Sequence, residues 1–156
     1  MTALRLGIAG LGHVGCGLID LVQRQDQLRM PGRVEIAGVS ARSRNRNRVV
    51  DTSSYAWYDD AAALAAQDDV DVFVELVGGS DGPAKVAVET ALKAGKPVIT
   101  ANKALIAIHG QELAELAAAN GVDLLFEAAV AGGVPVVRVL RDSLASVEIS
   151  RVAVFG

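Results

Sequence analysis

The sequence is poor in aromatic residues and has a single cysteine. Phenylalanine, tryptophan and tyrosine make up 4% of the 156 residues. The core must therefore consist mainly of valine, leucine, isoleucine and alanine, as in parallel sheets that are covered by helices. Cys16 is the one cysteine, which excludes an internal disulfide and a cysteine-based zinc site and gives no sign of an oxidising compartment.

Long apolar runs and an excess of basic residues are also missing. Glycines at positions 7, 10 and 12 interrupt the apolar run near the N-terminus, which argues against a signal peptide. No uninterrupted apolar run reaches membrane-spanning length. The net charge of −3 argues against nucleic acid as a main partner. We therefore expect a cytoplasmic protein that binds neither nucleic acid nor a membrane.

Short runs of valine, isoleucine and leucine alternate along the chain with alanine-rich segments of helical period. Strands are expected at Leu4–Ala9, Val34–Val39, Val70–Glu75, Pro97–Thr100, Val122–Phe126 and Val147–Val154. Helices are expected at Val14–Leu28, Asp59–Ala66, Pro83–Ala94, Gln111–Asn120 and Pro135–Ser143. This alternation is typical of an α/β fold with a doubly wound, mostly parallel sheet of the Rossmann type. We expect residues 1–145 to form this domain and residues 146–156 to begin a second region.

A glycine-rich turn follows the first expected strand and opens the first expected helix. It fits the pattern G-x-G-x-x-G and reads Gly10-Leu11-Gly12-His13-Val14-Gly15. Gly10 would allow the tight turn, Gly12 would let the backbone approach a pyrophosphate, and Gly15 would permit close packing of helix on strand. The phosphates would lie at the helix N-terminus, where free N–H groups and the helix dipole favour anions. The pattern in this context predicts a dinucleotide site.

The end of the second expected strand indicates which dinucleotide is bound. A fold that prefers NAD usually has a carboxylate there for the ribose 2′-hydroxyl, but this chain has Ser40 and, two residues later, Arg42. A guanidinium group binds phosphate in bidentate fashion, so this pair suits a 2′-phosphate. We therefore expect NADP to be favoured over NAD, and we expect Arg44, Arg46 and Arg48 to belong to a solvated polar loop.

The third expected strand ends in a pair of glycines, Gly78 and Gly79, in the stretch Val-Glu-Leu-Val-Gly-Gly. Glycines at a strand exit let the backbone approach a ligand, which in this topology would be the nicotinamide half of the cofactor. Glu75 either touches that site or holds a neighbouring loop, and the sequence leaves both interpretations open.

The fourth expected strand exits into Thr100-Ala101-Asn102-Lys103. In an open α/β sheet this exit is where ligands bind. Lys103 lies between alanines, so its ammonium group could be partly desolvated, which lowers a lysine pKa toward the range useful for proton transfer. The alternative is a surface lysine that solubilises a loop.

The motifs occur together in a recognisable order: Gly-Leu-Gly-x-Val-Gly at 10–15, Val-Glu-Leu-Val-Gly-Gly at 74–79, Gly-Lys-Pro-Val-Ile-Thr-Ala-Asn-Lys-Ala-Leu at 95–105, His-Gly at 109–110 and Phe-Glu-Ala-Ala-Val-Ala-Gly-Gly-Val-Pro at 126–135. The whole set resembles the N-terminal NAD(P)-binding region of homoserine dehydrogenase. The resemblance implies an oxidoreductase that interconverts L-homoserine and L-aspartate 4-semialdehyde with NADP(H) or NAD(H), in the biosynthesis of threonine, methionine and isoleucine. The residues expected to meet the cofactor are Gly10, Leu11, Gly12, His13, Val14, Gly15, Ser40, Arg42, Gly78, Thr100 and Lys103.

The same resemblance implies that Lys103 is catalytic, because the matching lysine binds substrate or assists proton movement. It also implies that a monovalent cation, typically sodium, is held at Glu127, Val130, Gly132 and Val134. Family members continue through a substrate-binding and dimerisation region, so we expect a homodimer and a chain that is inactive alone. Two alternatives remain, namely a non-catalytic NADP(H)-binding or partner module and a dehydrogenase of another small amino acid.

Overall fold

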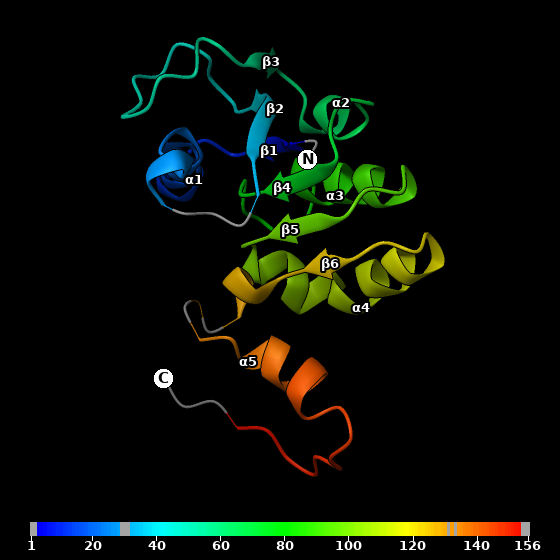
Figure 1. Cartoon of the computed structure of the whole chain (residues 1–156). Helices are drawn as coiled ribbons and strands as arrows, with labels where there is room; N and C mark the ends of the chain where they lie inside the picture. The colour runs from blue at the N-terminus through cyan, green and yellow to red at the C-terminus, as the bar shows by residue number, and fades with distance from the viewer. Residues whose placement is uncertain (1–2, 29–31, 131, 133, 154–156) are drawn as a thin grey trace.

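The computed structural model describes residues 3–28, 32–130, 132 and 134–153. Its centre is a six-stranded parallel sheet in the order β3-β2-β1-β4-β5-β6 (Figure 1). The strands are β1 (Leu4–Ala9), β2 (Val34–Ser40), β3 (Ala56–Tyr58), β4 (Val72–Glu75), β5 (Val98–Thr100) and β6 (Leu124–Leu125). The order reverses between β1 and β4, and ligands of doubly wound sheets bind outside the carboxyl ends of the strands at this switch point. The predicted fold class is confirmed.

Helices cover both faces of this sheet. They are α1 (His13–Gln23), η1 (Gln25–Gln27), α2 (Ala61–Ala65), α3 (Pro83–Lys93), α4 (Lys103–Ala119), η2 (Glu127–Ala129), α5 (Val136–Arg138) and η3 (Val139–Ser143). Helix α1 lies on one face, and α2, α3 and α4 lie on the other (Figure 1). None of the helices described is long and apolar enough to cross a membrane.

The two faces of the sheet build two separate apolar layers because successive strand residues point to opposite sides. Phe73 packs with α2, α3 and α4, whereas its neighbours Val72 and Val74 pack with α1. Alanines at helix positions such as Ala87 and Ala91 are fully buried, so α3 can approach the sheet closely. The core is therefore aliphatic on both sides, as the scarcity of aromatic residues predicts.

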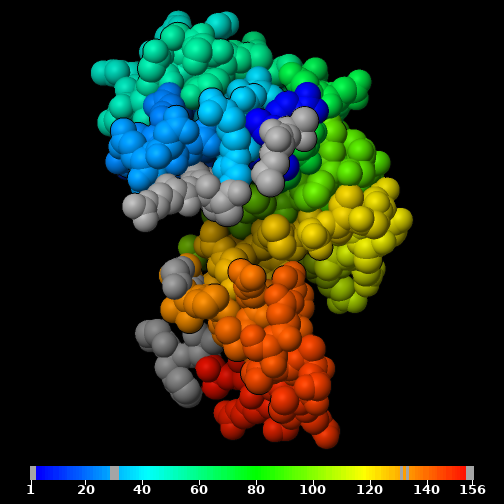
Figure 2. All heavy atoms as spheres, viewed as in Figure 1, coloured from blue at the N-terminus to red at the C-terminus, as the bar shows by residue number. Residues whose placement is uncertain are grey.

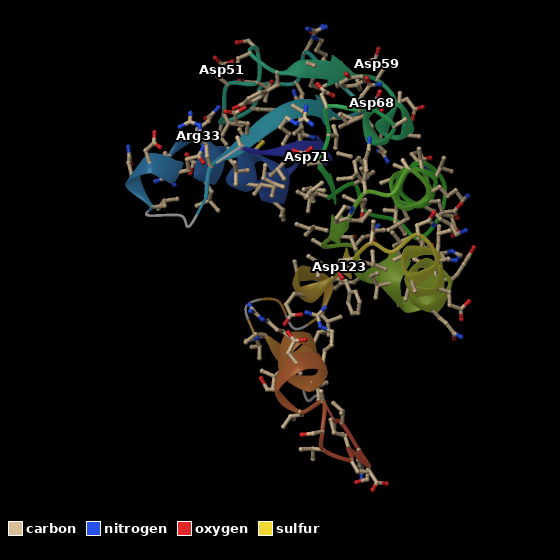
Figure 3. All side chains as sticks on the ribbon, turned by 45° about the vertical axis from the view of Figure 1, so that its right-hand side comes forward. Arg33, Asp51, Asp59, Asp68, Asp71 and Asp123 are labelled. Carbon is tan, nitrogen blue, oxygen red and sulfur yellow. The ribbon has the colours of Figure 1, made fainter. Side chains whose placement is uncertain are left out.

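Charged groups join β1 and β4 at the amino edge of the sheet, away from the switch point. The guanidinium group of Arg5 donates to both carboxylate oxygens of Asp71, at 3.1 and 2.8 Å, and the Arg5 backbone N–H donates to the same carboxylate at 2.8 Å. The hydrogen bonds from Arg5 hold the pKa of the Asp71 carboxyl below its ordinary value. Asp71 and Asp123, which precede β4 and β6, are labelled in Figure 3.

Two sequence-based expectations about the middle of the chain are wrong. Strand β3 was not expected, since Ala56–Tyr58 is short and lies in a polar stretch; it forms because its residues pair with Gly38–Ser40 at the end of β2. Helix α4 begins at Lys103 rather than at Gln111. Lys103 is therefore the first residue of a helix and not part of a loop.

The expected strand Val147–Val154 does not form over residues 147–153, which are irregular, and Val154 lies outside the described residues. A strand needs a neighbour to satisfy its backbone groups, and the irregular segment pairs with no strand described here. Residues 135–153 extend away from the body of the sheet (Figure 2). Val147, Ile149 and Val152 are exposed there, and the domain boundary near residue 145 stays a prediction.

Substitution of Gly10 by alanine should destabilise the fold by roughly 2–4 kcal/mol. Gly10 has a φ of 100°, and a Cβ atom there would lie 2.3 Å from the Leu76 carbonyl group. Urea unfolding of the chain measures the change. Gly17→Ala is the matched control, because Gly17 is exposed in α1 and a Cβ there meets nothing within 4 Å; it should be neutral or stabilise by up to about 1 kcal/mol. Equal stability of the two variants would contradict the prediction.

Candidate functional site

The glycine turn joins β1 to α1 and leaves the helix N-terminus open. A Cβ atom at Gly15 would lie 2.0 Å from the Gly10 carbonyl oxygen, so the helix packs directly on the turn. At Gly12 a Cβ would meet nothing within 4 Å, and no side chain caps the helix there. Uncapped N–H groups facing open space at a helix N-terminus form an anion-binding site.

The other residues of the turn divide between core and surface. His13 and Val14 are exposed on the first turn of α1, where their backbone N–H groups point out of the helix N-terminus. Leu11 is buried and packs with the core cluster around Ile8 and Ile19. Its side chain therefore anchors the turn, and only its backbone remains for a ligand.

The end of β2 lies beside this turn. The Gly10 backbone N–H donates to the Ser40 carbonyl oxygen at 2.8 Å, and Ser40 is buried whereas Arg42 is exposed. No carboxylate lies between Gly38 and Arg42. An arginine is thus available close to where the adenosine half of a dinucleotide lies in this topology.

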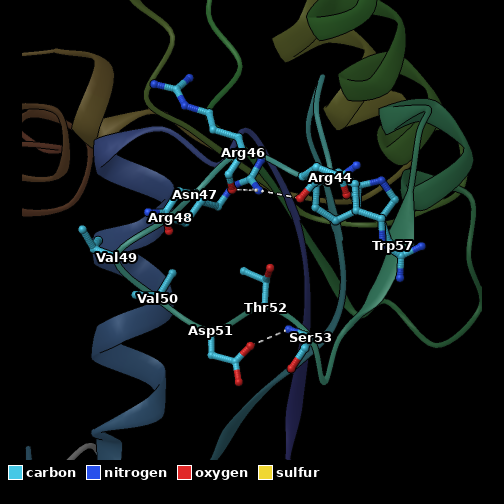
Figure 4. Close-up of a pocket in the computed structure, with 11 residues that line it drawn as sticks. Arg44, Arg46, Asn47, Arg48, Val49, Val50, Asp51, Thr52, Ser53 and Trp57 are labelled. Atoms are coloured by element: carbon cyan, nitrogen blue, oxygen red, sulfur yellow. Dashed lines mark hydrogen bonds between the residues drawn. The ribbon is translucent and has the colours of Figure 1, made fainter.

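The segment 43–53 is here called the arginine loop. Its residues 44–53 and Trp57 line an open pocket of about 570 Å³ (Figure 4). Arg48 holds the arginine loop together, because its guanidinium group donates to the carbonyl oxygens of Ser43, Arg44 and Arg46 at 2.5, 3.1 and 3.0 Å. The same group lies 5.3 Å from the ring centroid of Trp57. Arg48 is half-buried, so the expectation that it is solvated is wrong: it folds the loop around itself.

The remaining groups of the pocket are more open. Arg44 is exposed but lies 5.9 Å from the Trp57 ring centroid, within cation–π range, and Arg46 is exposed as expected. Asp51 accepts the Ser53 backbone N–H at 2.8 Å, and this hydrogen bond holds the pKa of the carboxyl below its ordinary value. Three arginines and one aspartate leave the pocket positively charged.

Glu75 ends β4 and is fully buried, which the sequence left unresolved. Its Oε1 atom accepts the backbone N–H groups of Val77 and Gly78 at 2.7 and 3.1 Å and the Asn102 side-chain amide at 3.4 Å. Its Oε2 atom accepts the Thr100 hydroxyl at 2.5 Å. Of the two interpretations, Glu75 thus holds the neighbouring loop. A lone acidic residue ending the buried run Val72–Glu75 is the sequence signal for such a role.

The exit of β5 belongs to the same network. Thr100 is fully buried, and its hydroxyl oxygen accepts the Asn102 backbone N–H at 3.0 Å while donating to Glu75. The Asn102 side chain caps α4 by accepting the Leu105 N–H at 3.1 Å and also donates to the Gly79 carbonyl oxygen at 2.7 Å. Sequence reasoning missed Asn102 as a cap, although asparagine is a favoured residue at that position.

Lys103 follows this cap directly and starts α4. The structure brings it to the same edge of the sheet as Gly78 and the glycine turn, but its side chain is exposed. The partial burial expected for its ammonium group is therefore not found in this chain. The rigid part of Lys103 is its backbone, which the capped helix holds in place.

His109 lies inside α4. Its Nε2 atom is 3.0 Å from Asp81 Oδ1 and its Nδ1 atom is 3.3 Å from Glu112 Oε2. Hydrogen bonds from Ser80 and then His109 hold the pKa of the Asp81 carboxyl below its ordinary value. The imidazole thus ties α4 to the loop before α3.

The loop around Glu127 follows β6. The Glu127 carboxyl accepts the Arg138 backbone N–H at 3.2 Å, and the carbonyl oxygens of Glu127 and Val134 accept N–H groups at 3.2 and 2.8 Å. Val130 is half-buried, whereas Gly132 and Val134 are exposed. Carbonyl and carboxylate oxygens suit a hard cation, so the oxygen atoms of this loop are of the kind that a sodium ion would bind. The described residues contain no group of three or more histidine, cysteine or acidic side chains that could hold a metal ion.

The strand order, the open helix N-terminus and the polar residues at the carboxyl edge define a dinucleotide-binding α/β domain of the Rossmann type. Residues 10–127 match the family model described as homoserine dehydrogenase, NAD binding domain. The chain therefore belongs to the homoserine dehydrogenase family and contains its NAD-binding domain.

Individual relatives agree with this assignment. The chain is 43% identical to the homoserine dehydrogenase of Corynebacterium glutamicum over 97% of its length, and 38% identical to that of Bacillus subtilis over 97%. The crystal structure of the homoserine dehydrogenase from Thiobacillus denitrificans superposes with a TM-score of 0.82 at 34% identity over 94% of the chain. The chain spans 34%, 35% and 34% of these three proteins, which is about a third of their length.

Substitution of Arg48 by lysine should loosen the arginine loop, because a compact ammonium group cannot replace a planar fork that reaches three carbonyl oxygens. We expect a loss of about 1–2 kcal/mol in unfolding free energy and a changed emission spectrum of Trp57, the one tryptophan of the chain. Arg46→Lys, on an exposed residue of the same loop, is the control. Unchanged emission and stability in the Arg48 variant would show that the loop does not depend on this guanidinium group.

Proposed function

We propose that this chain is the cofactor-binding part of an enzyme that interconverts L-homoserine and L-aspartate 4-semialdehyde. The observation that supports this function most is that the glycine turn, the Gly78–Gly79 turn and Lys103 follow three neighbouring strands, β1, β4 and β5, at the carboxyl edge of the sheet. A pure binding module has no evident need for a lysine on the nicotinamide side. The family relationship favours homoserine over another small amino acid as the substrate.

NADP(H) is the favoured cofactor in this proposal. The pyrophosphate would lie over Gly12 and the N-terminus of α1, where N–H groups face open space. Ser40 and Arg42 would take the 2′-phosphate, since β2 ends without a carboxylate and the Arg42 side chain is exposed. The positive charge of the neighbouring arginine loop supports an anionic group at this end.

Lys103 is the proposed catalytic residue. The nicotinamide ring, when bound, supplies the hydride acceptor for alcohol oxidation and the hydride donor for the reverse reaction. Lys103 would hold the substrate oxygen and help to move its proton, because its backbone is fixed by the helix cap while its side chain is exposed. Thr100 would contribute through its backbone, since its hydroxyl is bound to Glu75.

A sodium ion held by Glu127, Val130, Gly132 and Val134 is part of the same proposal, supported by the oxygen donors of that loop.

We also propose a cytoplasmic location and a homodimeric state. The exposed apolar side chains of Val147, Ile149 and Val152 support self-association. Size-exclusion chromatography with light scattering distinguishes a dimer from a monomer. A monomer at every protein concentration would remove the dimer from the proposal.

Replacing Arg42 by alanine should weaken NADPH binding about tenfold, because charge-assisted hydrogen bonds to a phosphate are lost, and should leave NADH binding within about twofold. Cofactor fluorescence titration measures both dissociation constants. Arg33→Ala is the matched control, since Arg33 is exposed and precedes β2 at its opposite end (Figure 3). Equal affinity of the unmodified chain for NADPH and NADH would contradict the proposed role of Arg42 in binding the 2′-phosphate.

Joined to the remaining two thirds of the Corynebacterium glutamicum relative, the chain should oxidise L-homoserine, whereas the 156 residues alone should not. In the joined protein, Lys103→Met should lower kcat by roughly a hundredfold. Lys93→Met, on the exposed surface of α3, is the control. Formation of reduced nicotinamide is the readout.

Two outcomes would contradict this part of the proposal. Robust turnover by the 156-residue chain would show that its site is already complete, and an unchanged kcat in the Lys103 variant would exclude Lys103 from the chemistry.

The same assay in sodium chloride and in choline chloride of equal ionic strength tests the proposed sodium site. Identical rates and melting temperatures in the two salts would remove the sodium ion from the proposal.

A further inference from the structure

The carboxyl group of Glu75 is fully buried, and its hydrogen-bond partners are groups of the protein itself. Its four partners are the N–H groups of Val77 and Gly78, the Thr100 hydroxyl and the Asn102 amide. The Thr100 hydroxyl oxygen accepts the Asn102 N–H, and its O–H donates to Glu75 Oε2. All four partners therefore donate, and both carboxyl oxygens of Glu75 act as acceptors in these bonds.

These bonds connect two segments that are far apart in the sequence. On one side are residues 77–79, whose glycines Gly78 and Gly79 have φ values of 84° and 85°. On the other side is the start of α4, where Asn102 caps the helix that begins with Lys103. Asn102 also donates to the Gly79 carbonyl oxygen at 2.7 Å. One buried carboxylate therefore sets the conformation of both segments.

Both segments lie on the half of the sheet that receives the second mononucleotide. In the order β3-β2-β1-β4-β5-β6 the adenosine half of a dinucleotide lies toward β2 and the nicotinamide half toward β4 and β5. We propose that Glu75 is a positioning residue for the nicotinamide half, acting through the backbone of residues 77–79 and through the first turn of α4. This role rests on the proposed dinucleotide function and adds a residue that touches neither cofactor nor substrate.

Glutamine cannot replace this carboxylate, although it has the same shape. With its NH₂ group in the place of Oε1, it would face the two N–H donors of Val77 and Gly78. With the NH₂ group in the place of Oε2, the Thr100 hydroxyl would lose its acceptor. Either orientation leaves a buried donor unpaired, and the network must rearrange.

The test compares whole cofactors with fragments that lack the nicotinamide ring. Glu75→Gln should weaken NADH and NADPH binding roughly tenfold, while ADP-ribose and 2′-phospho-ADP-ribose should bind within about twofold of the unmodified chain. The ratio of the two losses does not depend on which cofactor is preferred. Glu89→Gln is the matched control, since Glu89 is an ion-paired carboxylate on α3, and it should leave all four dissociation constants unchanged.

Asn102→Asp is the second variant, in case Glu75→Gln does not fold. It keeps the oxygen that caps α4 but places a carboxylate oxygen against Glu75 Oε1 and the Gly79 carbonyl, where the amide donates at 3.4 and 2.7 Å. The same selective loss of cofactor over fragment is expected. In the unmodified chain, the amide NMR signals of Val77 and Gly78 should shift with NADH and much less with ADP-ribose.

Equal losses of cofactor and fragment binding in the variants would overturn this role, because a merely structural effect weakens both. Unchanged cofactor binding in the variants, or equal shifts of the two amides with NADH and ADP-ribose, would overturn it as well. Failure of the unmodified chain to bind either NADH or NADPH would instead overturn the proposed function, and this role with it.

Discussion

The candidate site depends on the close approach of two turns at the carboxyl edge of the sheet. The Leu76 backbone N–H donates to the Ala9 carbonyl oxygen at 2.7 Å, and the Gly10 N–H donates to the Ser40 carbonyl oxygen at 2.8 Å. These bonds extend the pairing of β1 with β4 and β2 past the ends of the strands. They leave no room for a side chain at position 10, where a Cβ would overlap the Leu76 carbonyl group. The two halves of the site are joined at this point.

The polar network on the β4 side begins next to this contact. Glu75 immediately precedes Leu76 and lies in a strand buried on both faces, so its carboxylate can be satisfied only by internal donors. Thr100 and Asn102 on the neighbouring strand exit supply two of them. The β2 side is built differently, because the arginine loop is held at the surface by the guanidinium group of Arg48, which donates to the Ser43 carbonyl oxygen and lies over the Trp57 ring. The site therefore combines a rigid buried half with a more open, basic half.

The parts that sequence could predict are those with a local cause. Gly15 is required for a steric reason that lies within one strand, turn and helix, because a Cβ there would meet the Gly10 carbonyl oxygen, and the apolar runs mark five of the strands. Strand β3 depends on its pairing with the end of β2, and the half-burial of Arg48 depends on a loop conformation that gathers three nearby carbonyl oxygens around its guanidinium group. Residue pattern alone did not reveal either feature. Lys103 was placed correctly at the carboxyl edge, but its helix was predicted to begin eight residues too late, at Gln111 instead of Lys103, because the signal lay in the Asn102 cap.

The exposure of Lys103 bears on how its proposed chemistry could arise. A buried network fixes its backbone, since Asn102 caps α4 and is itself bonded to Glu75 and Gly79. The ammonium group at the end of the side chain is not covered by the described residues of this chain. An electrostatic contribution to catalysis is strong only where water is excluded. Under the proposed function, the groups that shield the Lys103 ammonium group from water must therefore come from elsewhere. They are the bound cofactor, the substrate and residues that the relatives carry outside the third of their length that this chain matches. Turnover then depends on the assembly of the whole site and not on Lys103 alone.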